Sequence, residues 1–87
     1  MYIQTAVISN PIGLHARPAI FLIQKANEFD SSIWLEKEER RINAKSLLGV
    51  LSLGVGTGEE IKIIGDGADE KEAVDALHKI ISSDFAE

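Results

Sequence analysis

Two different spacings of hydrophobic residues follow one another along this chain, and together they predict seven secondary-structure elements. Alternation of apolar and polar residues, which is typical of half-buried strands, covers residues 2–8, 32–37, 41–43 and 60–64. Apolar residues three or four positions apart, the spacing of an amphipathic helix, cover residues 16–28, 46–53 and the segment after Asp69. The predicted order is therefore β-α-β-β-α-β-α, without a linker or an internal repeat.

Turn and capping residues mark the ends of these elements. Ser9-Asn10-Pro11 closes the first strand, and the glycines of segment 54–58 stop the second helix because glycine is a poor helix former. Asp69-Glu70-Lys71-Glu72 resembles a capping box, which predicts that the Asp69 side chain caps the last helix. That helix carries an apolar stripe of Ala73, Val74, Leu77, Ile80 and Ile81.

This order of elements predicts an α+β fold, in which helices cover one face of a mostly antiparallel sheet. The pattern alone favours a ferredoxin-like pairing of the strands but does not determine their order. In the second strand, Ile33 and Leu35 share one face while Trp34 and Glu36 share the other. We expect the face of Trp34, Glu36 and Lys62 to be the one in contact with solvent.

The composition narrows the range of functions. The 87 residues suffice for one core, so we expect a single domain over residues 1–87. A net charge of −5 without a basic stripe argues against direct nucleic-acid binding. The absence of cysteine excludes thiolate metal sites, and two histidines without paired-ligand spacing predict neither a metal nor a cofactor. No apolar run is long enough to insert in a membrane, and the N-terminus lacks the basic region of a signal peptide, so we expect a cytoplasmic protein.

The segment Gly13-Leu14-His15-Ala16-Arg17-Pro18-Ala19 carries the most specific chemistry. Pro18 is tolerated only in the first turn of a helix, which places His15 at or just before the N-cap. Gly13 loosens the backbone in front of the motif. Free N–H groups of the first turn and the Arg17 guanidinium would then surround the imidazole, which predicts a place where a phosphoryl group rests on nitrogen.

His15 and Arg17 each also have a purely structural explanation. A histidine before a helix is often an N-cap or a loop residue, and an isolated arginine is often a solvated surface charge. The combination of His15, Arg17 and Pro18 in one motif favours the functional interpretation.

A second set of candidates lies in the short helix. Ser46 stands where serine is a preferred N-cap, which explains the residue without further function. Leu47, Leu48 and Leu51 cannot all face the core together with Val50 and Leu53, and Ile20 lies beside the core stripe of the first helix. An exposed apolar patch of Ile20, Leu47, Leu48 and Leu51 beside a reactive histidine would suit a docking surface.

The heptapeptide at residues 13–19 resembles the active-site signature of HPr, the histidine-containing phosphocarrier family of the bacterial phosphoenolpyruvate:sugar phosphotransferase system. The stretch Asn43-Ala44-Lys45-Ser46-Leu47-Leu48-Gly49-Val50-Leu51-Ser52-Leu53-Gly54 is similar to the family's second signature, around its regulatory serine. Length and element order match over essentially the whole chain. The resemblance implies an open-faced β-sandwich, with a four-stranded antiparallel sheet of order 1-4-2-3 and three helices on one face.

The resemblance also implies roles for individual residues. His15 would take a phosphoryl group on Nδ1 from phosphorylated enzyme I and pass it to the A domains of sugar permeases, with Arg17 pairing with the phosphoryl oxygens. Ser46 would be phosphorylated by an HPr kinase/phosphorylase and thereby engage a catabolite control repressor. Ile20, Leu47, Leu48 and Leu51 would form the shared contact patch of a monomer. Such a protein is a phosphocarrier rather than an enzyme with its own substrate pocket.

Two alternatives stay open within this resemblance. One is a purely regulatory corepressor, although the branch with only that role lacks the histidine. The other is a phosphocarrier of a non-sugar branch, which shares His15 and differs mainly in its partners.

Overall fold

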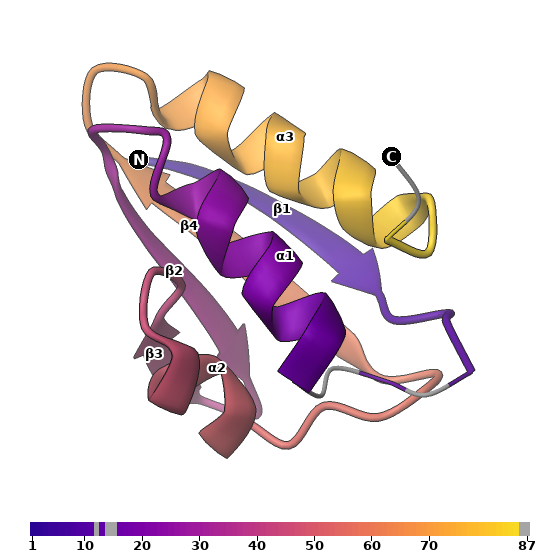
Figure 1. Ribbon diagram of the computed structural model, residues 1–87. Coiled ribbons are helices and arrows are strands. Elements are labelled where there is room, and N and C mark those ends of the chain that lie inside the picture. Colours follow the sequence, from indigo (N-terminus) through magenta and orange to yellow (C-terminus); the bar gives the residue numbers. More distant parts are fainter. Residues whose placement is uncertain (12, 14–15, 86–87) are drawn as a thin grey trace.

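The computed structural model describes residues 1–11, 13 and 16–85, and its elements follow the predicted order (Figure 1). They are β1 (Tyr2–Val7), α1 (Ala16–Ala26), β2 (Ser32–Lys37), β3 (Arg40–Asn43), α2 (Leu47–Ser52), β4 (Glu60–Asp66) and α3 (Glu70–Ser82). The predicted boundaries agree within two residues. The first helix ends earlier than expected, at Ala26 rather than residue 28, because residues 27 and 28 already turn toward β2.

The four strands form one antiparallel sheet in the order β1-β4-β2-β3. This order confirms the topology that the resemblance implies, and the ferredoxin-like pairing favoured by the pattern alone is wrong. Alternation specifies which face a strand buries, but it does not specify which neighbour the strand pairs with. β4, late in the sequence, lies between β1 and β2 and therefore joins the two halves of the sheet.

The three helices lie on one side of the sheet, and the core fills the space between the two layers (Figure 1). The apolar stripe predicted for the last helix is confirmed, and in the first helix Ala19, Leu22 and Ala26 are buried while Ile23 is half-buried. Fully or nearly fully buried core residues include Ala6, Ala19, Leu22, Ala26, Ile33, Leu35, Val50, Ile61, Ile63, Ala73, Val74, Leu77, Ile80 and Ile81. Among the helices described, none has the length and apolar character needed to cross a membrane.

The opposite face of the sheet is only partly wet. Lys62 is exposed as predicted, but Trp34 and Glu36 are half-buried. Trp34 pairs directly with Ile64, which is only 1% exposed, and the Arg41 guanidinium lies 5.8 Å from the centroid of the Trp34 ring. Side chains of directly paired residues lie on the same face, so Trp34 and Ile64 make part of this face, which we expected to be polar, apolar instead.

The start of α3 departs from the predicted capping box. Asp69 occupies the N-cap position, but its side chain makes no capping hydrogen bond. Its carboxylate instead accepts hydrogen bonds from the backbone N–H groups of Asp30 (3.0 Å) and Ser31 (2.9 Å) and from the Ser31 hydroxyl. Glu70 accepts the N–H of Gly67 at 3.1 Å. Donors from the loop after α1 therefore replace the helical donors that the local sequence suggests.

Candidate functional site

His15, the predicted phosphoryl acceptor, lies outside the described residues, so the site is built from the residues on either side of it in the sequence. Gly13 precedes it, and α1 begins with the next residue, Ala16. Pro18 is the third residue of α1 and thus lies in the first turn, as predicted, where its missing N–H leaves no helical hydrogen bond unmade.

The beginning of α1 is electropositive. Its first turn contains no acidic residue, and Arg17 is exposed. Within the described part of the chain, Arg17 takes part in none of the ion pairs. The unpaired N–H groups and the positive end of the helix dipole act in the same direction as the guanidinium. An anion beside this turn would therefore be stabilised.

Gly13 is required at its position by its backbone conformation and by its close approach to residues 55 and 56. Its φ is +80°, and a Cβ atom at this position would lie 3.0 Å from the carbonyl oxygen of Val55 and 3.1 Å from the Cα of Gly56. The Asn10 side chain donates a hydrogen bond to the Gly13 carbonyl at 2.8 Å, and the Gly13 N–H donates to the Asn10 carbonyl at 3.3 Å. Only glycine combines this conformation with so close an approach.

The C-terminal turn also reaches this region, which the sequence did not indicate. A depression of about 590 Å³ is lined by Asn10, Pro11, Arg17, Pro18, Phe21, Asp84 and Phe85. The Ser9 hydroxyl donates a hydrogen bond to the Asp84 carboxylate, and the Phe85 N–H donates to the Ile80 carbonyl at 2.8 Å. Asp84 and Phe85 both have positive φ values, so a sharp turn after α3 directs them toward the start of α1.

Ser46 is the N-cap of α2, as predicted. Its backbone is extended (φ −110°, ψ 121°), and its hydroxyl accepts a hydrogen bond from the N–H of Gly49 at 3.2 Å. The residue is half-buried. This geometry confirms the capping interpretation of Ser46.

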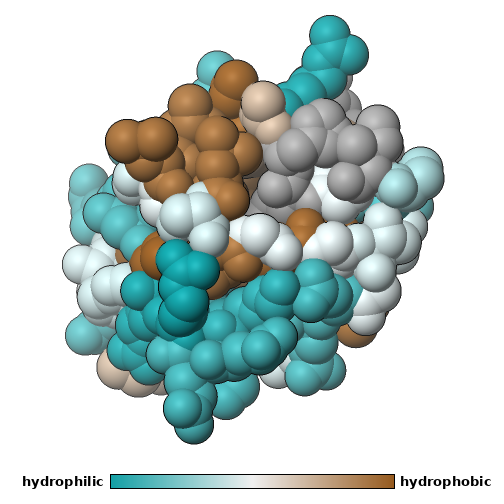
Figure 2. Space-filling view, turned by 90° about the horizontal axis from the view of Figure 1, so that it is seen from below, coloured by the Kyte–Doolittle hydropathy of each residue, from teal (hydrophilic) through white to brown (hydrophobic). Residues whose placement is uncertain are grey.

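The predicted apolar residues are exposed to different degrees. Ile20 is 44% exposed, Leu47 41% and Leu48 81%, whereas Leu51 is half-buried and packs against the core. α1 and α2 contact each other, so these side chains belong to neighbouring helices. We call Ile20, Leu47 and Leu48 the apolar patch. Figure 2 shows a group of hydrophobic atoms on a surface that is otherwise largely polar.

Asn10 is a further residue of this site whose role the sequence analysis did not identify. It is buried and holds Gly13 from both its side chain and its carbonyl, yet the sequence identified it only as part of a turn. Asparagine beside proline is a turn signal, but the partner of its amide group depends on the fold. In the described residues, no cluster of acidic, histidine or cysteine side chains could hold a metal.

Comparison with known proteins gives a consistent result. The family model for the phosphorylation site of the PTS HPr component matches residues 3–83. The phosphocarrier protein HPr of Treponema pallidum is 38% identical over 87 residues, covering 100% of this chain and 99% of the relative. The HPr-like protein Crh of Bacillus subtilis is 49% identical over 65 residues, covering 75% of this chain and 76% of the relative.

Solved structures agree with these relatives. The crystal structure of HPr-C-His from Thermoanaerobacter tengcongensis superimposes with a TM-score of 0.96 at 47% identity, covering 100% of this chain and 98% of that one. The crystal structure of Bacillus subtilis Crh, described as a domain-swapped dimer, gives a TM-score of 0.79 at 39% identity, with 100% of both chains covered.

Proposed function

Because this chain belongs to the HPr family of the phosphoenolpyruvate:sugar phosphotransferase system, we propose that it carries a phosphoryl group on His15 from phosphorylated enzyme I to the A domains of sugar permeases. The observation that carries this proposal is the start of α1 directly after His15, with Arg17 and Pro18 in its first turn. The proposal treats residues 1–87 as one HPr domain in the cytoplasm, without membrane insertion or direct nucleic-acid binding.

The proposed transfer exchanges one N–P bond for another. A lone pair on Nδ1 of His15 attacks phosphorus, the N–P bond of enzyme I breaks, and its histidine recovers the electron pair. The positive end of α1 and Arg17 disfavour the imidazolium, which keeps the lone pair available. The same groups stabilise the dianionic phosphoryl group, and Arg17 suits its oxygens because a guanidinium donates two parallel hydrogen bonds. Transfer to a permease A domain repeats the exchange, so the chain is a covalent intermediate rather than an enzyme.

The apolar patch, together with Leu51, is the proposed docking surface for these partners. Exposed leucine and isoleucine side chains on two packed helices support this role, because large apolar side chains exposed together mark interaction sites. A relay also requires each partner to leave before the next arrives. We therefore expect a monomer that binds enzyme I with a dissociation constant of about 1 μM or weaker.

Ser46 is the proposed site of regulation by an HPr kinase/phosphorylase. A phosphate there would be stabilised by the start of α2, where the Gly49 N–H already donates a hydrogen bond to the Ser46 hydroxyl. It would also place about two negative charges next to Leu47 in the apolar patch. Docking of enzyme I would weaken, while a catabolite control repressor could recognise the modified form.

A regulatory corepressor is the second candidate function, because the similarity to Crh extends over three-quarters of this chain. Its discriminating feature is His15, since a protein with only that role does not need a phosphoryl acceptor at this position. A phosphocarrier of a non-sugar branch would retain His15 and use other partners.

The deciding experiment is phosphorylation of the purified protein by enzyme I and phosphoenolpyruvate, followed by phosphorus-31 NMR. We expect an acid-labile, base-stable signal that is lost in the His15→Ala variant. A folded protein that accepts no phosphoryl group would contradict the carrier role and favour the corepressor.

A further inference from the structure

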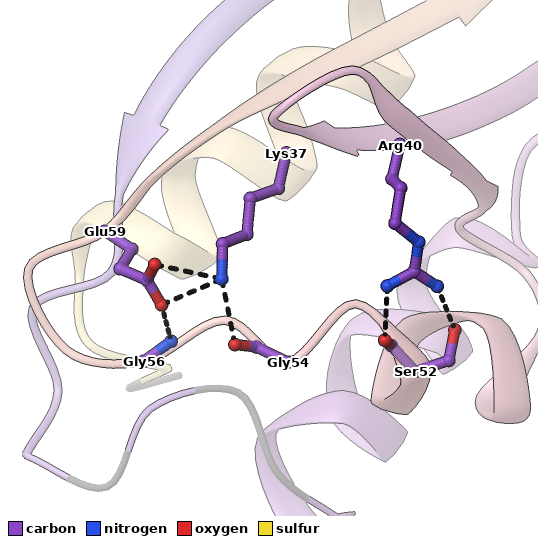
Figure 3. A network of polar contacts seen from close by, with 6 residues as sticks. All are labelled: Lys37, Arg40, Ser52, Gly54, Gly56 and Glu59. Atoms are coloured by element: carbon purple, nitrogen blue, oxygen red, sulfur yellow. Dashed lines mark hydrogen bonds and ion pairs between the residues drawn. The ribbon is translucent and has the colours of Figure 1, made fainter.

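An ion pair between Lys37 and Glu59 holds the connection between α2 and β4 in place. Lys37, at the end of β2, lies 2.9 Å from one carboxylate oxygen of Glu59 and donates a hydrogen bond to the other at 3.1 Å. It also donates to the Gly54 carbonyl at 3.0 Å (Figure 3). Glu59 in turn accepts the N–H of Gly56 at 2.6 Å. Lys37 therefore contacts both ends of segment 54–59, at Gly54 and at Glu59. Glu59 also bonds back to Gly56 within the segment.

The hairpin between β2 and β3 presents Lys37 in this direction. Glu38 and Glu39 both have positive φ values, the conformation of the tight turns that connect neighbouring strands. Lys37 and Arg40 are paired across the hairpin, and their side chains point the same way (Figure 3). Arg40 donates to the carbonyl and hydroxyl oxygens of Ser52. Two cations of one hairpin thus reach the backbone that leaves α2, where unpaired carbonyls concentrate negative charge.

Other groups of segment 54–59 contact residues that precede His15 in the sequence. The Gly58 N–H donates to the Ile8 carbonyl at 2.6 Å, and the Ile8 N–H donates to the Glu59 carbonyl at 3.0 Å. The Thr57 hydroxyl donates to the Asn10 carbonyl at 2.7 Å. Gly13 completes the contact with its close approach to Val55 and Gly56. Ile8, Asn10 and Gly13 therefore all contact segment 54–59, which we call the platform.

We propose that Lys37 and Glu59 are positioning residues for phosphoryl transfer, acting on the chain before His15 through segment 54–59. This proposal rests on the proposed carrier function. It assigns the pair no contact with the phosphoryl group. Gly56, held by Glu59, would determine where Gly13 lies, and Gly13 is two residues before His15 in the sequence.

The charge state of Glu59 suits this role. The hydrogen bond from Gly56, followed by that from Lys37, holds the pKa of Glu59 below its ordinary value of 4.5. The carboxylate is therefore charged at neutral pH and retains both partners. The Lys37 side chain is 16% exposed and that of Glu59 is 39% exposed, so the ion pair is partly shielded from solvent.

The test compares Glu59→Gln with Glu60→Gln, the same change one residue later. Glu60 is exposed and forms no ion pair with a described residue. Glutamine at 59 keeps the side-chain length but loses the charge that Lys37 neutralises. We expect Glu59→Gln to lower the kcat of phosphorylation by enzyme I about three- to tenfold and to leave the KM for the carrier within about twofold, because the apolar patch is intact. Glu60→Gln should change neither.

Amide NMR spectra of the same variants provide a readout that does not depend on phosphorylation. We expect the Gly56 and Gly13 resonances to shift in Glu59→Gln and to stay unchanged in Glu60→Gln. Lys37→Met, which keeps the apolar stem, should reproduce the kcat loss, and the double variant should lose little more than the larger single loss. A wild-type protein that accepts no phosphoryl group would contradict the carrier function, whereas the Gly13 shift would still test the platform.

Three outcomes would overturn the positioning role. The first is a Gly13 resonance that does not move in Glu59→Gln. The second is a loss of thermal stability with kcat equal to that of Glu60→Gln, which would show a purely structural ion pair. The third is a raised KM with unchanged kcat, which would place Glu59 in the docking surface instead.

Discussion

The carboxylate of Asp69 accepts a hydrogen bond from the backbone N–H of Ser31 at 2.9 Å, across 38 positions of sequence. This contact, with those from Asp30 and the Ser31 hydroxyl, ties the start of α3 to the loop between α1 and β2. A residue that the sequence identifies as a local cap is therefore a tertiary link.

Asp69→Asn should make the protein less stable and should change the pH dependence of its stability. The hydrogen bonds from Ser31 and Asp30 hold the pKa of Asp69 below its ordinary value of 3.8. Because the folded-state pKa is the lower one, the stabilisation is fully present above the ordinary value and is lost as pH falls through the folded-state pKa. Urea unfolding between pH 7 and pH 2 should show a smaller acid-dependent loss in Asp69→Asn than in the wild type. Identical pH profiles would contradict this role.

Gly13→Ala should destabilise the protein more than Gly54→Ala does. Both glycines have positive φ, which costs an alanine about 1–2 kcal/mol at either position. A Cβ at Gly54 meets open space, whereas a Cβ at Gly13 comes 3.0 Å from the Val55 carbonyl oxygen. The difference between the two variants in urea unfolding thus measures the close approach, and phosphorylation by enzyme I should slow only in Gly13→Ala. Equal losses of stability would show that the loop 54–59 moves aside easily.

Ser46→Ala should lower the free energy of unfolding by about 1 kcal/mol, because the Gly49 N–H loses its acceptor. Ser46→Asp should keep the cap, since a carboxylate accepts the same hydrogen bond and suits the helix N-terminus. Under the proposed regulation, Ser46→Asp alone should slow phosphorylation by enzyme I. Thermal unfolding and enzyme I assays on both variants separate the two effects. A large stability loss in Ser46→Asp would indicate that the serine is chiefly a structural cap.

Leu48→Ala should weaken docking without affecting the fold. Its side chain is exposed, so we expect the free energy of unfolding to change by less than about 0.5 kcal/mol. The dissociation constant for enzyme I should rise about tenfold, the loss expected for a central apolar contact of an interface. Leu22→Ala, in the buried stripe of α1, should instead cost about 2–5 kcal/mol of stability. Calorimetric titration with enzyme I provides the binding measurement, and an unchanged dissociation constant would place the docking surface elsewhere.

The sequence by itself determined the features that depend on neighbours within one turn or one strand. The apolar stripes of α1 and α3, the position of Pro18 in a first turn and the cap at Ser46 all follow from local spacing and local hydrogen bonds. The family resemblance at residues 13–19 and 43–54 supplied the sheet order, which the pattern alone did not.

Only the tertiary structure decided which distant groups meet. It pairs Asp69 with Ser31, brings Gly13 against Val55, and connects Lys37 to Glu59. The local sequence suggests a helix cap at Asp69 and a flexible backbone at Gly13, and it gives no indication of a partner for Lys37. Hydrophobic periodicity specifies which face is buried, but hydrogen-bond and charge partners depend on how strands and helices are placed side by side.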